Sequence, residues 1–79
     1  MTDTLEIVIG AIAAFCKCEK STITPETKLA QDLQMRSVAR IGLAADLEER
    51  LGVKITTFDI LKPKSVQDIV DMIQKKQNA

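Results

Sequence analysis

Histidine, tryptophan and tyrosine are absent from this chain, and phenylalanine occurs only twice among its 79 residues. Without histidine, the chain lacks the commonest general base and the commonest metal ligand. With so few aromatic rings, it also lacks the platforms on which the bases of single-stranded nucleic acids stack. Eleven basic residues balance eleven acidic residues, so the net charge of zero creates no field that would favour nucleic acid or a membrane surface. We therefore expect no metal site and no nucleic-acid partner.

Cysteines and long apolar runs are also scarce. Cys16 and Cys18 are the only cysteines, and their spacing differs from the CxxC pattern of redox and zinc sites. Residues two apart on a helix point in different directions, so we expect two reduced thiols in a cytoplasmic protein. The apolar segment 5–15 contains Glu6, follows Asp3 rather than a positive charge, and is too short to span a bilayer. We expect it to form a core helix.

Aliphatic residues at helical spacing dominate what is present. They predict a first helix from about Thr4 to Cys18, whose start Asp3 or Thr4 can cap. A long connection should follow over 19–36, with a turn at 24–26. The apolar residues expected to pin this connection to the core are Ile23, Leu29 and Leu33.

A second helix is predicted from Ser37 to about Leu51, with Gly52 as its terminator. Gly42 lies inside this helix, at a cost of about 1 kcal/mol relative to alanine. Two interpretations of Gly42 remain open: a close approach by another segment, or no structural role.

Two further helices complete the pattern. A short helical turn is predicted within 56–61, capped by Thr56 or Thr57 and limited by Pro63. The residues from Ser65 to Asp68 form a variant of the capping box, which opens the last helix. Its core stripe should comprise Val66, Ile69, Val70 and Ile73. We therefore predict an all-α fold, a small four-helix bundle of three longer helices and one short helix, with residues 1–79 as a single domain.

The start of the second predicted helix carries the most informative motif. Ser37 places a hydroxyl where backbone N–H groups point outward unpaired, a position that suits either a helix cap or a phosphate. The segment 32–38, with sequence DLQMRSV, resembles the modification site of acyl carrier proteins, in which an Asp-Leu pair and a short turn precede Asp-Ser-Leu. The order of long, long, short and long helices is also similar to that family, most clearly over residues 32–73.

The resemblance implies carriage rather than catalysis. In this family a phosphopantetheinyl transferase attaches 4′-phosphopantetheine from coenzyme A to the serine, here Ser37, and the thiol of the arm holds acyl groups as thioesters. A tether of this kind raises the effective concentration of its cargo at partner enzymes. The implied partners are acyl-loading and acyl-transfer enzymes of fatty-acid, polyketide or other specialised pathways, which dock near Ser37 and the second helix of a monomer. Candidate acyl-pocket residues are Leu43, Leu47, Ile55, Ile60 and Ile69, although ordinary core packing explains the same residues.

The chain departs from the family in its charge. Arg36 stands where the family has an aspartate, Arg40 follows in the first turn, and the net charge is zero in place of a strongly acidic one. A cation in the first turn opposes the helix dipole, whereas a phosphodiester on Ser37 would bring an anion to both guanidinium groups. The alternative is that both arginines are solvated and have no role.

This departure predicts a specialised carrier that serves dedicated enzymes, because charge complementarity governs partner choice. Two alternatives stay open: a peptidyl or aminoacyl carrier, and an unmodified binding module related to acyl carrier proteins. An enzyme is disfavoured, because Ser37 has no histidine to activate it.

Overall fold

The computed structural model describes residues 4–78, which form helices and connecting segments. The predicted all-α, four-helix fold is confirmed, and within the described residues only an isolated antiparallel bridge between Lys28 and Ser65 adds β-type pairing. The elements in chain order are α1 (Thr4–Cys16), the 3₁₀ turn η1 (Lys20–Thr22), α2 (Ser37–Leu51), α3 (Thr57–Leu61) and α4 (Val66–Gln77).

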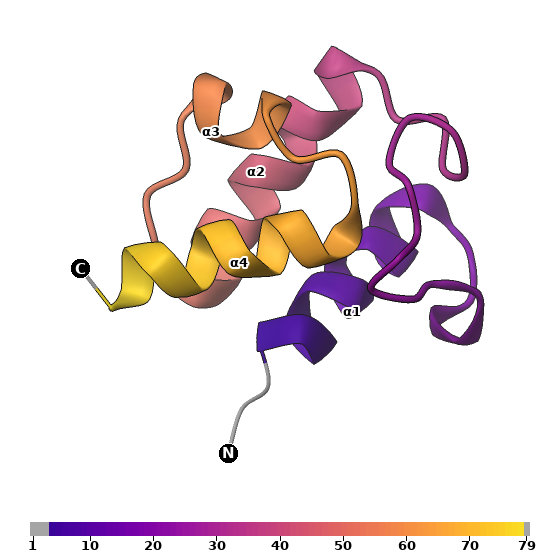
Figure 1. The fold of residues 1–79 in the computed structure, drawn as a ribbon, viewed down its shortest axis with the longest axis horizontal. Coiled ribbons are helices and arrows are strands. Elements are labelled where there is room, and N and C mark those ends of the chain that lie inside the picture. The colour runs from indigo at the N-terminus through magenta and orange to yellow at the C-terminus, as the bar shows by residue number, and fades with distance from the viewer. Residues whose placement is uncertain (1–3, 79) are drawn as a thin grey trace.

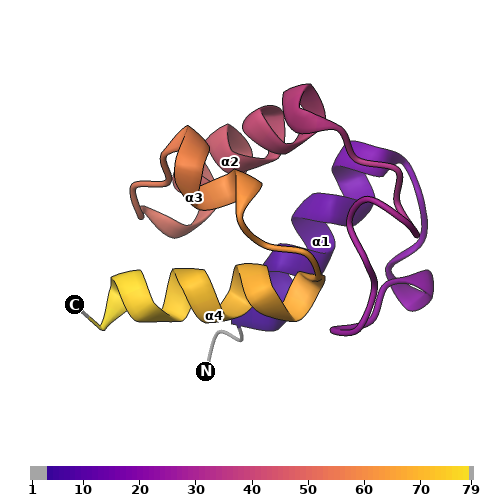
Figure 2. The ribbon, with the colours of Figure 1, turned by 45° about the horizontal axis from the view of Figure 1, so that its top comes forward.

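The helices enclose an aliphatic core. Helix α1 packs against both α2 and α4, and the short α3 packs against α2 (Figures 1 and 2). In Figure 1 α4 passes in front of α2, and in Figure 2 it lies below α2 and α3. The predicted stripe on α4 is confirmed, because its four residues are all buried. The largest fully buried side chains are Val8, Ile12, Leu29, Leu43, Leu47, Ile60, Val66, Ile69 and Ile73.

Helix α1 ends two residues earlier than the sequence pattern predicts. Lys17 adopts a left-handed backbone with φ of 55°, which stops the helix at Cys16. The N–H of Cys18 then donates to the carbonyl of Ala13 at 3.0 Å, as in a Schellman-type ending. Cys16 and Cys18 are free thiols, and burial raises the pKa of the Cys16 thiol, with a further contribution from Cys18. The predicted cap by Asp3 lies outside the described residues.

The long connection between α1 and α2 is ordered around its predicted anchors. Ile23 and Leu29 are buried and Leu33 packs against the core, so the three anchors are confirmed. The predicted turn is also present, since the N–H of Thr27 donates to the carbonyl of Thr24 at 3.0 Å. The turn η1 has no counterpart in the sequence prediction.

Main-chain hydrogen bonds join this connection to the segment that opens α4. The N–H of Leu29 donates to the carbonyl of Lys64 at 2.9 Å, and the N–H of Val66 donates to the carbonyl of Thr27 at 3.0 Å. These bonds satisfy backbone groups that burial would otherwise leave unpaired. They fix the path of the chain toward Ser37.

The predicted helix signals act where they were expected. Gly52 ends α2 with a left-handed φ of 67°. Thr56 and Asp59 form a reciprocal capping box at the start of α3. Ser65 and Asp68 form a second box at the start of α4. The starts of the last two helices are therefore specified by local sequence.

Gly42 marks a close approach between α1 and α2. A Cβ atom at this position would lie 2.8 Å from Cζ of Phe15, shorter than normal van der Waals contact. Of the two interpretations of Gly42, the structure therefore supports the close approach. The ring of Phe15 covers the glycine and remains partly exposed at its outer edge.

We expect the effect of Gly42→Ala on stability to depend on Phe15. In the Phe15→Ala background, the substitution should stabilise by about 0.5–1 kcal/mol, because alanine favours the helix over glycine. In the native background, displacement of the ring should remove at least ~0.5 kcal/mol of this gain. Urea unfolding of the four proteins measures the coupling, and equal effects of Gly42→Ala in the two backgrounds would contradict it.

Candidate functional site

Ser37 is the first residue of α2, and its side chain is exposed. Arg36, not Ser37, is the N-cap residue of α2. Its backbone is extended, and its side chain makes no capping hydrogen bond. The interpretation of Ser37 as a helix cap is therefore wrong. Among residues 4–78, no group is hydrogen-bonded to the Ser37 hydroxyl. The hydroxyl thus stands free at the positive end of a 15-residue helix.

The chain immediately before Ser37 is held by a buried side chain that the sequence prediction missed. Met35 is only 5% exposed, and its N–H donates to the carbonyl of Leu29 at 2.9 Å. Gln34 adopts a left-handed φ of 53°, which turns the chain toward α2. Asp32 closes the preceding turn by accepting from the N–H of Lys28 at 2.8 Å. The buried Met35 therefore fixes the position of the chain that leads into Ser37. In the sequence, the signal for this role of Met35 was an isolated apolar residue within a polar segment.

The outward face of α2 next to Ser37 is apolar. Val38 is 83% exposed and Ile41 is 45% exposed, and Ala45 continues the same row at helical spacing. We refer to Val38, Ile41 and Ala45 as the outward α2 face. Arg36 is exposed at its beginning.

Arg40 points to a different neighbour from the one that the sequence suggests. Its Nη1 donates to the carbonyl oxygens of Leu61 at 3.1 Å and Pro63 at 2.9 Å, at the end of α3. Contact with a phosphodiester on Ser37 would therefore depend on the other guanidinium hydrogens. These partners lie more than 20 residues along the chain, so no local pattern could reveal them.

The acidic residues of α2 are largely engaged within the protein. Asp46 pairs with Arg50 at 2.9 Å on the same helix. Glu48 accepts from the N–H of Ile55 at 2.9 Å and holds the connection to α3. Glu49 is exposed without such a contact among the described residues. The surface around Ser37 therefore offers little free negative charge.

The five candidate acyl-pocket residues come together in one core cluster. All five are buried and packed with their neighbours, so an acyl chain can enter only where these side chains part. The members are Leu43, Leu47, Ile55, Ile60 and Ile69.

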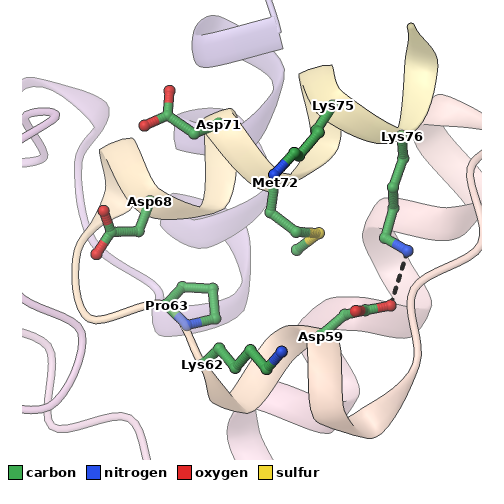
Figure 3. A pocket seen from close by; sticks show the side chains of 8 residues that line it. All are labelled: Asp59, Lys62, Pro63, Asp68, Asp71, Met72, Lys75 and Lys76. Atoms are coloured by element: carbon green, nitrogen blue, oxygen red, sulfur yellow. Dashed lines mark ion pairs between the residues drawn. The ribbon is translucent and has the colours of Figure 1, made fainter. Parts of the chain in front are cut away.

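A separate open groove lies between α3 and α4, and none of the five residues lines it (Figure 3). Met72 projects into the groove, and charged side chains surround it. Asp59 pairs there with Lys76 at 2.7 Å and ties α3 to α4. The hydrogen bond from Lys76, with further bonds from the backbone and hydroxyl of Thr56, lowers the pKa of Asp59 to about 2.

The comparisons with known proteins agree with this arrangement. Residues 6–73 match the model of the family described as "Phosphopantetheine attachment site". The chain belongs to this family of phosphopantetheine-binding acyl carriers. It is 35% identical to the meromycolate extension acyl carrier protein of Mycobacterium leprae, over 95% of this chain and 69% of that protein. It is 33% identical to the acyl carrier protein of Thermosynechococcus vestitus, over 95% of this chain and 93% of that protein.

Membership in the acyl carrier family accounts for the chemistry that the chain lacks. An acyl carrier is not a catalyst: it bears covalent 4′-phosphopantetheine and presents acyl groups to other enzymes. Its partners include a phosphopantetheinyl transferase and enzymes that process acyl groups. Among residues 4–78, no helix combines the length and apolar character needed to span a membrane.

The ion pair of Asp59 should appear in the pH dependence of stability. Because the folded pKa lies below the unfolded value of about 4, its contribution is present above pH ~4 and is lost as the pH falls toward 2. We expect the stability difference between the native protein and Asp59→Asn to shrink over this interval in urea unfolding. In a Lys76→Met background, this stability difference should change less with pH. An equal change in both backgrounds would contradict the assignment of the lowered Asp59 pKa to Lys76.

Replacing the residue before Ser37 should stabilise the unmodified carrier. Arg36→Asp introduces an acceptor for the free N–H groups of the first turn of α2 and a favourable charge. We expect a gain of about 1 kcal/mol in the free energy of unfolding. Arg36→Ala, which removes the cation without adding an acceptor, should gain less. Equal stability of the two variants in urea unfolding would argue against an uncapped helix start.

Proposed function

We propose that Ser37 carries the 4′-phosphopantetheine arm. The observation that supports this proposal is the exposed, unpartnered hydroxyl of Ser37 at the start of α2, in register with the serine of acyl carrier proteins. In the loading step, the Ser37 oxygen forms a phosphodiester with the pantetheine phosphate. The bond from that phosphorus to the nucleotide breaks, the nucleotide leaves, and the hydroxyl proton passes to the transferase or to solvent. The helix dipole and the side chain of Arg36 favour the resulting anion.

Partner enzymes dock on Ser37 and the outward α2 face in this proposal. Exposed apolar side chains supply the contact area, and Arg36 replaces the negative charge typical of the family at this point. Since complementary charge sets association rates and partner choice, the altered surface favours dedicated enzymes. The monomeric state and the cytoplasmic location expected from the sequence stay predictions.

The cargo is an acyl group whose chain is sheltered by the core cluster beneath α2 and α3. Relatives named for meromycolate extension and as acyl carrier proteins support an acyl rather than an aminoacyl cargo. The replacement of the family aspartate by Arg36 supports one alternative, a binding module that is never loaded.

Intact-protein mass spectrometry after incubation with coenzyme A and a broad-specificity phosphopantetheinyl transferase tests the proposal. We expect a gain of one phosphopantetheinyl group in the native chain and no gain in Ser37→Ala. The matched control is Ser21→Ala, which removes another exposed serine and should load normally. If several transferases leave the native chain unchanged, the unloaded binding module becomes the better description. Loading of Ser37→Ala would place the arm elsewhere.

A further inference from the structure

Helix α3 is the least embedded helix of the bundle. It has five residues, and Ile60 is its one buried residue. Its start is secured by the capping box of Thr56 and by the contact of Asp59 with Lys76. Because Ile60 is its one buried side chain, α3 also relies on polar contacts to keep its position over the core.

The end of α3 lacks the usual donors for its carbonyl groups. Pro63 has no N–H, and the N–H groups of Lys64 and Ser65 both donate to the carboxylate of Asp68. The N–H of Val66 donates to the carbonyl of Thr27 in the connection between α1 and α2. Residues 63–66 therefore supply no backbone donor to this end of the helix.

Arg40 supplies the missing donors from α2. Its Nη1 bonds the carbonyls of both Leu61 and Pro63, and its side chain is half-buried at this junction. At the opposite end of the same junction, Glu48 holds the N–H of Ile55. The contact between α2 and α3 therefore has one charged side chain at each end.

The residues beneath this contact are part of the proposed acyl pocket. Leu43 and Leu47 follow Arg40 along one side of α2, and Ile60 lies opposite on α3. Ser37, Arg40, Leu43 and Leu47 follow one another at helical spacing along α2. Arg40 therefore lies between the proposed attachment position and these buried residues.

We propose that Arg40 is a positioning residue that holds the end of α3 closed over the core and so limits entrance of the carried acyl chain. Release of the two carbonyls lets the end of α3 move outward while Glu48 holds its beginning. This inference rests on the proposed loading of Ser37, because it concerns where the chain on that arm goes. The hold on α3 itself does not require the arm.

The test begins with hydrogen exchange of the unloaded protein. Arg40→Met keeps a long apolar stem and removes the donors, and we expect amides in 57–64 to exchange about tenfold faster, as for loss of a hydrogen bond from a charged group. Arg40→Lys should give an intermediate rate, because its ammonium lacks the planar fork of arginine. The matched control is Arg50→Met on the same helix, which should leave 57–64 unchanged because Arg50 pairs with Asp46 within α2. Unchanged exchange in Arg40→Met overturns the proposal.

The second measurement uses the protein loaded from octanoyl-coenzyme A. Hydroxylamine attacks the thioester carbonyl, the carbon–sulfur bond breaks, and a hydroxamate and the free thiol form. We expect cleavage about threefold slower in Arg40→Met than in the native chain, because the insertion equilibrium shifts toward the sheltered chain. If Arg40→Met shows faster hydrogen exchange but faster or unchanged thioester cleavage, then Arg40 holds α3 without limiting entrance of the acyl chain. That result overturns the inference. If the native chain does not load, the proposed function is rejected. The hydrogen-exchange rates of the unloaded protein then still decide whether Arg40 holds the end of α3.

Discussion

The main-chain pairing between the long connection and the beginning of α4 is the constraint on which the site depends. Bonds from Leu29 to Lys64 and from Val66 to Thr27 hold two segments that are far apart in the sequence. They satisfy backbone groups that a folded connection would otherwise bury without partners. With the connection held in this way, Met35 reaches the core and α2 begins at Ser37.

The helix that begins there differs from the two that follow it. Capping boxes close the starts of α3 and α4, whereas Arg36 leaves the first turn of α2 without a side-chain acceptor. The unmodified carrier therefore keeps a positive helix end and a free serine hydroxyl on its surface. In the proposed function, a phosphodiester on Ser37 would bring to this position the negative charge that the chain itself does not provide.

Helix α3 is held in place by few contacts. It has one buried side chain, and side chains from α2 and α4 further secure it through Arg40, Glu48 and Lys76. Elements with little buried surface and a few polar ties open at lower free energy than core helices. In the proposed function, a weakly embedded helix over an aliphatic core would let the carrier shelter its cargo and release it in turn.

The sequence by itself determined the four helices, the starting caps of α3 and α4, the core stripe of α4 and the place of Ser37 at the start of α2. These features depend on spacing and capping over a few residues, which a linear pattern records directly. Only the tertiary structure decided that Phe15 covers Gly42 and that Arg40 bonds the end of α3. Each of these contacts joins residues more than 20 positions apart, so its existence depends on how the helices pack and not on either local sequence.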